Sequence, residues 1–272
     1  MTVLTLRRVE IAVFLLVACG LHAAEEEPDR GRLGVNLGGY FHYGPVDGFL
    51  QTPAGGQPGS SSHHRPTLDE LDIHDAVFYD VVGSIDWHRL RLFAGYEAIG
   101  LDGDSVLSES LVSRSVTFPA GTAVRSSTEL NWLRVGAGWK FDFADQHLEL
   151  VPKAELALLD FSYQLSGGGQ GVSRSYAKGC VRLGLESRYR FNRTVSLSLE
   201  AAASLPLSNT PQIAVLSGGF QFDPLPATWR YRPTFFVGGG AQRIEYEDNQ
   251  ELPNHFRIDM GPFVTAGLGF SF

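Results

Sequence analysis

The sequence predicts an all-β fold, a closed antiparallel up-and-down barrel of transmembrane strands. Apolar residues recur at every second position over segments much longer than an average soluble strand. Short and long connections alternate between these segments. No run of about twenty apolar residues follows the N-terminal region, so no membrane helix is expected there. We expect ten strands, with eight as the alternative.

Each predicted strand is a segment in which apolar residues alternate with polar or small ones. Where the alternation is regular, one apolar residue of the expected outward face is given in parentheses. The strands are, in chain order, 32–43 (Leu37), 73–87 (Val81), 89–101 (Leu92), 130–143 (Val135), 147–163, 175–191 (Leu183), 195–205 (Leu199), 212–222, 229–246 (Phe235) and 256–272 (Leu268).

Two of these strands are irregular. Leu158 and Leu159 are both apolar, which breaks the alternation of strand 147–163 and predicts a β-bulge there. Segment 212–222 alternates poorly. If it is a loop, a second strand must be lost with it, because a barrel with both termini on one side of the membrane has an even number of strands. Eight strands would then remain.

The last strand, 256–272, has the clearest pattern. Apolar residues take every second position up to the final aromatic residue, and the positions between them are mostly polar or glycine. A transmembrane β-strand crosses the hydrocarbon with about ten tilted residues, which fits this length. The expected lipid-facing row is Ile258, Met260, Pro262, Val264, Ala266, Leu268, Phe270 and Phe272.

The connections and the aromatic residues predict how the barrel lies in a membrane. Short connections are expected near 86–88, 144–146, 192–194 and 223–228, and long ones at 44–72, 102–129, 164–174, 206–211 and 247–255. Aromatic side chains prefer the headgroup level. One girdle is expected beside the short turns, from Trp87, Trp139, Phe141, Tyr189, Phe191, Trp229, Tyr231, Phe270 and Phe272, and a second towards the long loops, from Tyr43, Tyr79, Tyr96 and Tyr163, with Trp132 facing inward.

The positions expected to face inward carry charges of both signs. A barrel of eight to ten strands has a narrow interior that side chains fill, and charges there need partners. We expect a plug of ion pairs, the alternative being a path for ions or solutes. The expected lumen network is Arg89, Arg91, Glu97, Arg134, Lys140, Lys153, Glu155, Arg182, Glu186, Arg188, Arg230, Arg232, Arg257 and Asp259, within a wider inward set that includes Asp80, Asp86, Glu149, Arg190 and Glu200.

The first 24 residues have the pattern of an export signal, with Arg7 and Arg8 before a short apolar run. Residues 16–19 also fit a lipobox, which would make Cys19 a lipidated N-terminus. Processing by an ordinary signal peptidase and processing as a lipoprotein both stay open. Residues 25–30 would form a short N-terminal segment and residues 31–272 the barrel.

From residue 31 onward the chain resembles a bacterial outer-membrane β-barrel protein of the small porin-like or generic barrel group. The resemblance rests on the alternating strands, the girdle and the C-terminal segment 267–272. In that group the barrel-assembly machinery reads a C-terminal aromatic residue and the alternate apolar residues before it. The resemblance therefore implies an assembly signal at Phe272, Phe270 and Leu268, outer-membrane lipid as surroundings, and periplasmic termini.

Function is less constrained than location. The net charge of −8 argues against a nucleic-acid partner. Residues that could bind zinc or act as acid and base are His63, His64, Asp69, Glu70, Asp72, His74 and Asp75, but we expect them to form a solvated polar loop. We expect no catalytic residue, metal or cofactor.

The leading hypothesis is a structural or surface-interaction barrel with long extracellular loops and an unknown extracellular ligand. A narrow channel is the first alternative and a hydrolase at the extracellular rim the second. A soluble lipocalin-like barrel would have its apolar rows inside instead of outside.

Overall fold

A computed structural model describes residues 33–51, 66–113, 116–144, 147–225, 229, 231–249 and 254–272. The predicted leader, with Cys19, lies outside these ranges. No helix among the described residues is long and apolar enough to cross a membrane. The strands are β1 (Leu33–Gln51), β2 (Asp75–Trp87), β3 (Leu90–Val106), β4 (Leu111–Ser113), β5 (Val116–Phe118), β6 (Ala123–Trp139), β7 (Phe141–Phe143), β8 (Leu148–Gly167), β9 (Gln170–Arg190), β10 (Val195–Ser204), β11 (Gln212–Phe222), β12 (Arg232–Glu247) and β13 (His255–Ser271), and η2 (Asp69–Leu71) is a 3-10 turn.

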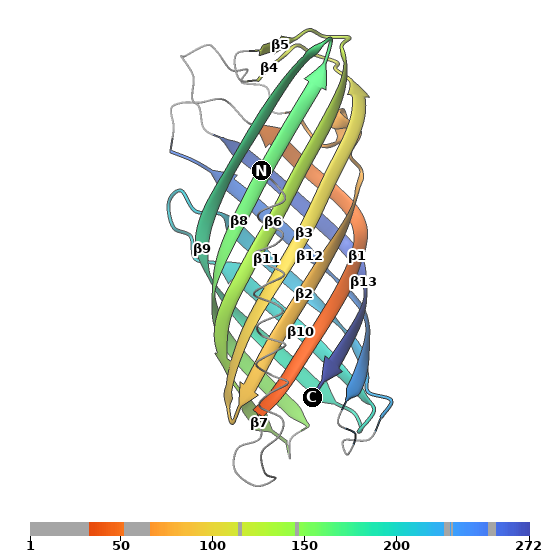
Figure 1. The fold of residues 1–272 in the computed structure, drawn as a ribbon, viewed down its shortest axis with the longest axis vertical. Coiled ribbons are helices and arrows are strands. Elements are labelled where there is room, and N and C mark those ends of the chain that lie inside the picture. Colours follow the sequence, from red (N-terminus) through yellow and green to blue (C-terminus); the bar gives the residue numbers. More distant parts are fainter. Residues whose placement is uncertain are drawn as a thin grey trace.

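The sheet closes on itself into an antiparallel barrel (Figure 1). Strand β1 pairs with both β2 and β13, and β6 pairs with both β3 and β8. Strand β7 continues β6 past Lys140, whose N–H donates to the Arg89 carbonyl at 2.7 Å. With β6 and β7 counted as one, ten described strands form the barrel, and β4 and β5 pair with each other outside it. The predicted fold class and strand number are confirmed.

Strand β11 is the segment whose alternation is poorest, and it nevertheless forms over the predicted residues 212–222. Its ladder to β12 runs through every residue, and its ladder to β10 runs from Ala214 to Phe222. Small residues at Ser217, Gly218 and Gly219 weaken the sequence pattern but fit between two partner strands, and the eight-strand alternative is wrong.

Several strands extend well beyond their predicted ends on the side away from the short connections. The expected long connection 164–174 does not exist, because β8 and β9 meet at a two-residue turn. Gly168 and Gly169 occupy it with φ of 59° and 78°, as a tight hairpin turn requires. Strands β3 and β6 likewise continue to Val106 and from Ala123, which shortens the expected loop 102–129.

The expected bulge at Leu158 and Leu159 is also wrong. Strand β8 pairs with β6 and β9 without a shift of register there. Leu158 is exposed on the outer face, whereas Leu159 is buried inside. Both positions are apolar because the polarity of the two faces changes at this level.

A real irregularity lies in β13 at Gly261. Its pairings with β1 and β12 shift in register between Met260 and the residues that follow Pro262. Gly261 has φ of 128°, a conformation that favours glycine. As a result Ile258 and Met260 are buried inside the barrel, whereas Pro262 is outside. The predicted lipid-facing row is therefore correct only from Pro262 onward.

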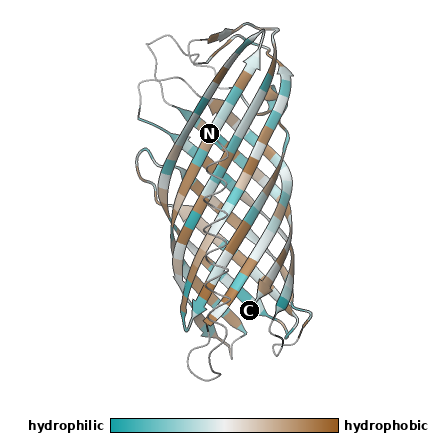
Figure 2. Ribbon diagram, viewed as in Figure 1, coloured by the Kyte–Doolittle hydropathy of each residue, from teal (hydrophilic) through white to brown (hydrophobic). Residues whose placement is uncertain are grey.

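The barrel thus has two zones of opposite polarity. In the lower barrel, the half next to the short connections, apolar side chains lie on the outside. Figure 2 shows hydrophobic and hydrophilic residues alternating along the strands. In the upper barrel, beyond about the level of Tyr43, Leu158 and Pro262, apolar side chains fill the inside and polar ones face out. Exposed apolar residues of the lower barrel are Val81, Leu92, Val135, Leu156, Leu183, Leu199, Leu216, Phe235, Val237, Val264 and Leu268.

Aromatic side chains gather at the short-connection end of the lower barrel. Those exposed there are Trp87, Trp139, Phe141, Phe143, Tyr189, Phe191, Trp229, Tyr231 and Phe270. Phe272 lies edge-on to the ring of Tyr231, with centroids 5.5 Å apart. At the other edge Tyr43 and Tyr79 are exposed, but Tyr163 is buried inside the upper barrel and does not join a second girdle.

Candidate functional site

The lumen of the lower barrel is crossed by an ion-pair network centred on Arg91. Its guanidinium donates to both carboxylate oxygens of Asp86, at 2.8 and 3.1 Å. It also pairs with Glu149 at 3.4 Å and Glu186 at 3.2 Å. Lys140, which lies between β6 and β7, pairs with Asp86 of β2 at 3.3 Å. One arginine therefore links carboxylates of β2, β8 and β9 across the lumen.

Lys153 extends the network to β10. Its ammonium donates to Glu186 at 2.8 Å and to Glu200 at 2.7 Å, and it lies 5.1 Å from the centre of the Phe93 ring. The side chain is only 4% exposed. A buried ammonium would be costly without such partners, and two carboxylates and an aromatic face surround this one.

A second layer of charge lies above the first. Arg134 pairs with Asp80 at 2.6 Å and with Glu97 at 3.9 Å, and Gln242 donates to Glu97 at 2.7 Å. These side chains come from β2, β3, β6 and β12. Opposite walls of the barrel are therefore joined at this level as well.

Trp132 separates the charged layers from the upper barrel. The guanidinium carbons of Arg134 and Arg182 lie 4.9 and 4.4 Å from the centre of its ring. Arg182 also pairs with Glu155 at 3.3 Å, and both side chains of that pair are at most 1% exposed. A charged and an apolar environment meet at one indole, which can contact both.

Above Trp132 the lumen is filled by a continuous apolar core. Phe161 stacks on Phe256 with centroids 4.7 Å apart, and Phe78 meets Phe263 edge-on at 5.2 Å. Residues of the η2 turn and of the β4–β5 hairpin cover this core from above. Its fully buried members include Leu50, Leu68, Leu71, Ile99, Leu101, Phe118, Leu130, Leu159, Leu165, Ile213, Ile244, Ile258 and Met260.

Most of the expected lumen residues lie in these layers. Those with ion pairs there are Arg91, Glu97, Arg134, Lys140, Lys153, Glu155, Arg182 and Glu186. Arg188 and Arg232 occupy inward positions but form no ion pair with a described residue. Arg89 is exposed in the turn before β3, and Arg230 lies outside the described residues. Gln242 and Trp132 join the layers although neither is charged, so a search for charges misses them.

Arg257 and Asp259 are on the outer face, not in the lumen. The irregularity at Gly261 inverts the two faces of β13, so the residues expected inside point outward. Asp259 there accepts hydrogen bonds from Arg257 and from Arg243 of β12. Partial burial alone would raise the pKa of Asp259, but these two arginines outweigh it and hold the pKa below its ordinary value.

The polar groups of the upper rim that the structure describes form no metal-binding cluster. His74 lies 3.2 Å from Asp69 and 3.0 Å from Asp72, and all three side chains are more than half exposed. Among the described residues no three His, Cys, Asp or Glu side chains are placed to hold a metal ion. His63 and His64 lie outside those residues.

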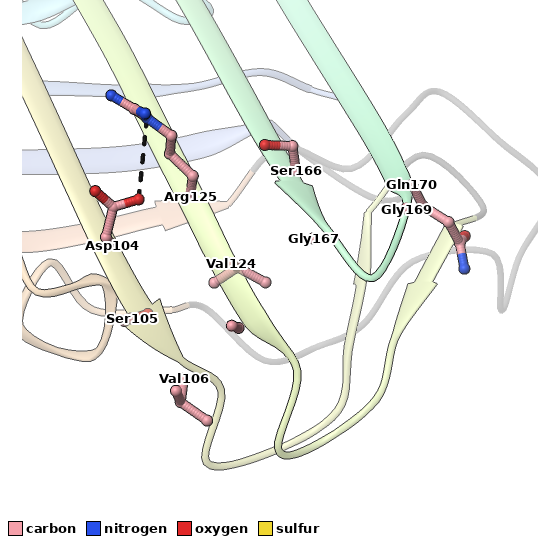
Figure 3. A pocket seen from close by; sticks show the side chains of 10 residues that line it. Asp104, Ser105, Val106, Val124, Arg125, Ser166, Gly167, Gly169 and Gln170 are labelled. Carbon is pink, nitrogen blue, oxygen red and sulfur yellow. Dashed lines mark ion pairs between the residues drawn. The ribbon is translucent and has the colours of Figure 1, made fainter.

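An open depression of about 640 Å³ lies at the upper ends of β3, β6 and the β8–β9 hairpin (Figure 3). Its wall carries Asp104 and Arg125, whose charged atoms are 3.9 Å apart and both largely exposed. Ser105 also lines it, with a buried hydroxyl that has no hydrogen-bond partner among the described residues. The other polar side chains of the lining, Asp104, Arg125, Ser166 and Gln170, are exposed.

Comparison with known proteins gives a fold-level likeness. No family model and no curated protein matches the sequence. Among solved structures, the outer membrane protease OmpT of Escherichia coli is 10% identical, with 92% of this chain and 100% of that chain covered and a TM-score of 0.46. Ail, the attachment invasion locus protein of Yersinia pestis, is 7% identical, with 89% of this chain and 99% of that chain covered and a TM-score of 0.39. The outer membrane protein OprG of Pseudomonas aeruginosa is 7% identical, with 88% of this chain and 95% of that chain covered and a TM-score of 0.38.

These neighbours are bacterial outer-membrane β-barrel proteins. Their names cover an attachment protein and a protease, at identities of 10% or less. None of these activities is transferred to the present chain, because a shared barrel does not determine function. The barrel itself is established by its own strand pairing.

Proposed function

We propose that this chain is a bacterial outer-membrane barrel of structural or surface-interaction type, with a lumen closed to solutes. Its termini would be periplasmic and its upper barrel would stand outside the cell. The partners that follow are outer-membrane lipid and, during biogenesis, the barrel-assembly machinery acting on Phe272, Phe270 and Leu268.

The exposed apolar band of the lower barrel supports the membrane assignment. Leu156 of β8 is 61% exposed and Val264 of β13 is 64% exposed. These two strands lie opposite each other around the circumference of the barrel. A soluble barrel would leave such a continuous apolar surface in water, which monomeric proteins avoid. Exposed aromatic residues edge the band at the short connections, where amphipathic rings prefer to lie.

Two barriers in series support the closed lumen, and this is the observation that carries the proposal. The charged layers around Arg91 and Arg134 join opposite walls of the barrel. The apolar core above Trp132 then excludes a hydrated path. An ion would have to break several buried ion pairs and cross an apolar interior, both of which cost several kcal/mol.

Conductance tests the proposal directly. Protein folded into planar lipid bilayers should give no steady current steps, and migration on a gel should change on heating, as for a folded barrel. Regular steps of current from such a preparation would favour the narrow channel instead. A folded, non-conducting protein that hydrolyses lipid or peptide substrates, with activity lost in the His74→Ala variant, would favour the rim hydrolase.

A further inference from the structure

Strand β9 is much longer than its neighbour β10. The two strands pair only from Arg182 to Arg190 of β9, and the last backbone hydrogen bond runs from the Leu205 N–H to the Val181 carbonyl at 2.8 Å. Beyond that point β9 continues to Gln170 and pairs with β8 alone. The upper part of β9 is therefore the edge of a tall wall formed by β3, β6, β8 and β9, visible in Figure 1.

The hydrogen-bonding direction of each β9 residue follows from the ladder. In an antiparallel pair the N–H and C=O of one residue face the same neighbour, and successive residues alternate. The Arg190 N–H donates to β8, through the His147 carbonyl, and the Val181 carbonyl accepts from the β10 side. Hence the backbone groups of Ser175, Ala177 and Gly179 face the side that β10 has left.

The upper edge of β9 carries no proline and no shift of register, and its charged residues Arg174 and Lys178 point inward. Proteins block edges with charged side chains, proline, bulges or a covering segment. Ser175, Ala177 and Gly179 are small, uncharged and exposed. The opposite edge of the same wall, in β3, is covered, because the Leu71 carbonyl of the η2 turn packs directly against Gly103.

The inner side of the β9 edge presents aromatic faces and positive charge. Tyr176 lies 5.3 Å from Tyr246 between ring centres, and the Lys178 ammonium lies 5.5 Å from the Tyr246 ring. The Arg174 guanidinium lies 6.0 Å from the Tyr176 ring. Neither cation forms an ion pair with a described residue, and the buried Tyr176 hydroxyl and Arg174 Nε lack a hydrogen-bond partner there.

A second copy of the chain does not fit this edge. Barrel strands tilt by about 35–45° from the membrane normal. Two barrels inserted in the same direction would cross their β9 strands at about twice that angle, and strands crossed so steeply cannot form a ladder. The occupant must therefore be a free extended segment outside the membrane.

We propose that the upper edge of β9 binds an extended peptide segment of a partner protein by strand addition, with acidic side chains directed at Arg174 and Lys178. Main-chain hydrogen bonds to Ser175, Ala177 and Gly179 would supply affinity, and the inner cations and tyrosines would select the sequence. The inference names the partner class of the proposed surface-interaction barrel and rests on the upper barrel lying outside the cell.

A designed heptapeptide tests the inference on the full-length folded protein in detergent. The probe is acetyl-Thr-Glu-Thr-Phe-Thr-Glu-Thr-amide, in which alternate residues face inward as a strand requires, and the control replaces both Glu by Lys. We expect the acidic probe to bind at least tenfold more tightly than the basic one. It should also slow amide hydrogen exchange at Ser175, Ala177 and Gly179, which are fast in the free protein. Edge amides already protected without peptide would overturn the inference.

Two pairs of variants separate strand addition from general adhesion. Ala177→Pro removes an edge N–H without touching the β8 ladder and should weaken the acidic probe about tenfold, since one lost main-chain bond corresponds to roughly that factor. Its control, Ala177→Thr, keeps the N–H and should bind as the wild type does. Lys178→Glu should reverse the preference between probes, whereas Arg125→Glu on the outer face of β6 should not.

Equal binding by Ala177→Pro and Ala177→Thr would overturn strand addition. A folded protein without conductance but with no response to either probe would overturn only the peptide site. Conductance without altered peptide binding would instead contradict the closed lumen, so the two proposals fail separately.

Discussion

The lower and upper halves of the barrel are built from the same strands with opposite polarity. Along β8, Leu156 and Leu158 are exposed on the outer face of the lower barrel, whereas Leu159 and Leu165 are buried in the upper barrel. The lower lumen holds Arg91, Lys153 and their carboxylates, and the upper lumen holds an apolar core. The surroundings of each half decide which face is apolar: lipid demands an apolar outside, and water demands an apolar inside.

The largest effect is expected from breaking the buried ion pair at the boundary between the halves. Arg182→Met leaves Glu155 charged and buried, which should lower the free energy of unfolding by about 3–5 kcal/mol. Denaturant unfolding of the protein in lipid vesicles measures this. The double variant with Glu155→Leu should recover most of the loss, and a double variant as unstable as the single one would show that the pair does not act as a unit.

Truncation of the upper core should have an effect of similar or slightly smaller size. Phe161→Ala removes a buried ring stacked on Phe256 and should cost about 3–5 kcal/mol. Because the upper barrel lies outside the apolar band, the loss should also appear as faster amide exchange in β8 and β13 above Leu159. Uniform exchange changes through both halves would mean that the halves do not differ in stability.

A matched pair of arginine substitutions on one face of β8 measures the polarity change itself. Leu156→Arg places a charge in the apolar band near its upper edge and should cost about 1–2 kcal/mol, between the costs at the bilayer midplane and at the interface. Gln164→Arg makes the same addition on the same face in the upper barrel and should change stability by less than about 0.5 kcal/mol. Equal costs at the two positions would remove the distinction between the zones.

The smallest effect is expected at the outer ion pairs of the upper barrel. Asp259→Asn should cost less than about 1 kcal/mol at pH 7, because its partners Arg243 and Arg257 are well exposed. The lowered pKa of Asp259 means that its contribution is present above the unfolded pKa and is lost as the pH falls through the folded one. Unfolding curves of wild type and variant should therefore converge only when the pH falls below the lowered pKa of folded Asp259.

The sequence predicts the lower barrel well. The short connections, the outward apolar rows and the aromatic band all follow from an alternation of period two with lipid outside. Even β11 is placed correctly, because the closure of the barrel requires it between β10 and β12. Eight of the expected lumen charges also lie in the ion-pair layers.

The upper barrel is harder to predict because alternation does not reveal which face is wet. Gln164, Ser166, Ser173 and Ser175 resemble a loop in the sequence, yet they are the outward residues of two paired strands. A single irregular residue is equally difficult to detect. The misplacement of Arg257 and Asp259 follows entirely from Gly261, whose conformation no residue pattern in 256–272 reveals.

Strands β8 and β13 solve one geometric problem in two ways. In β8 the backbone stays regular, and the apolar residues move from even to odd numbers at Leu158 and Leu159. In β13 the apolar residues stay at even numbers throughout, and the backbone turns them from the inside to the outside at Gly261. A regular ladder through Gly261, with every residue kept, would send Phe256 and Ile258 outward and Arg257 and Asp259 into the dry interior. Deletion of Gly261 would instead leave both faces of β13 as they are. One extra residue thus joins two halves of a strand whose apolar residues face opposite sides of the barrel wall. An insertion or deletion within either half keeps both faces only if it involves an even number of residues.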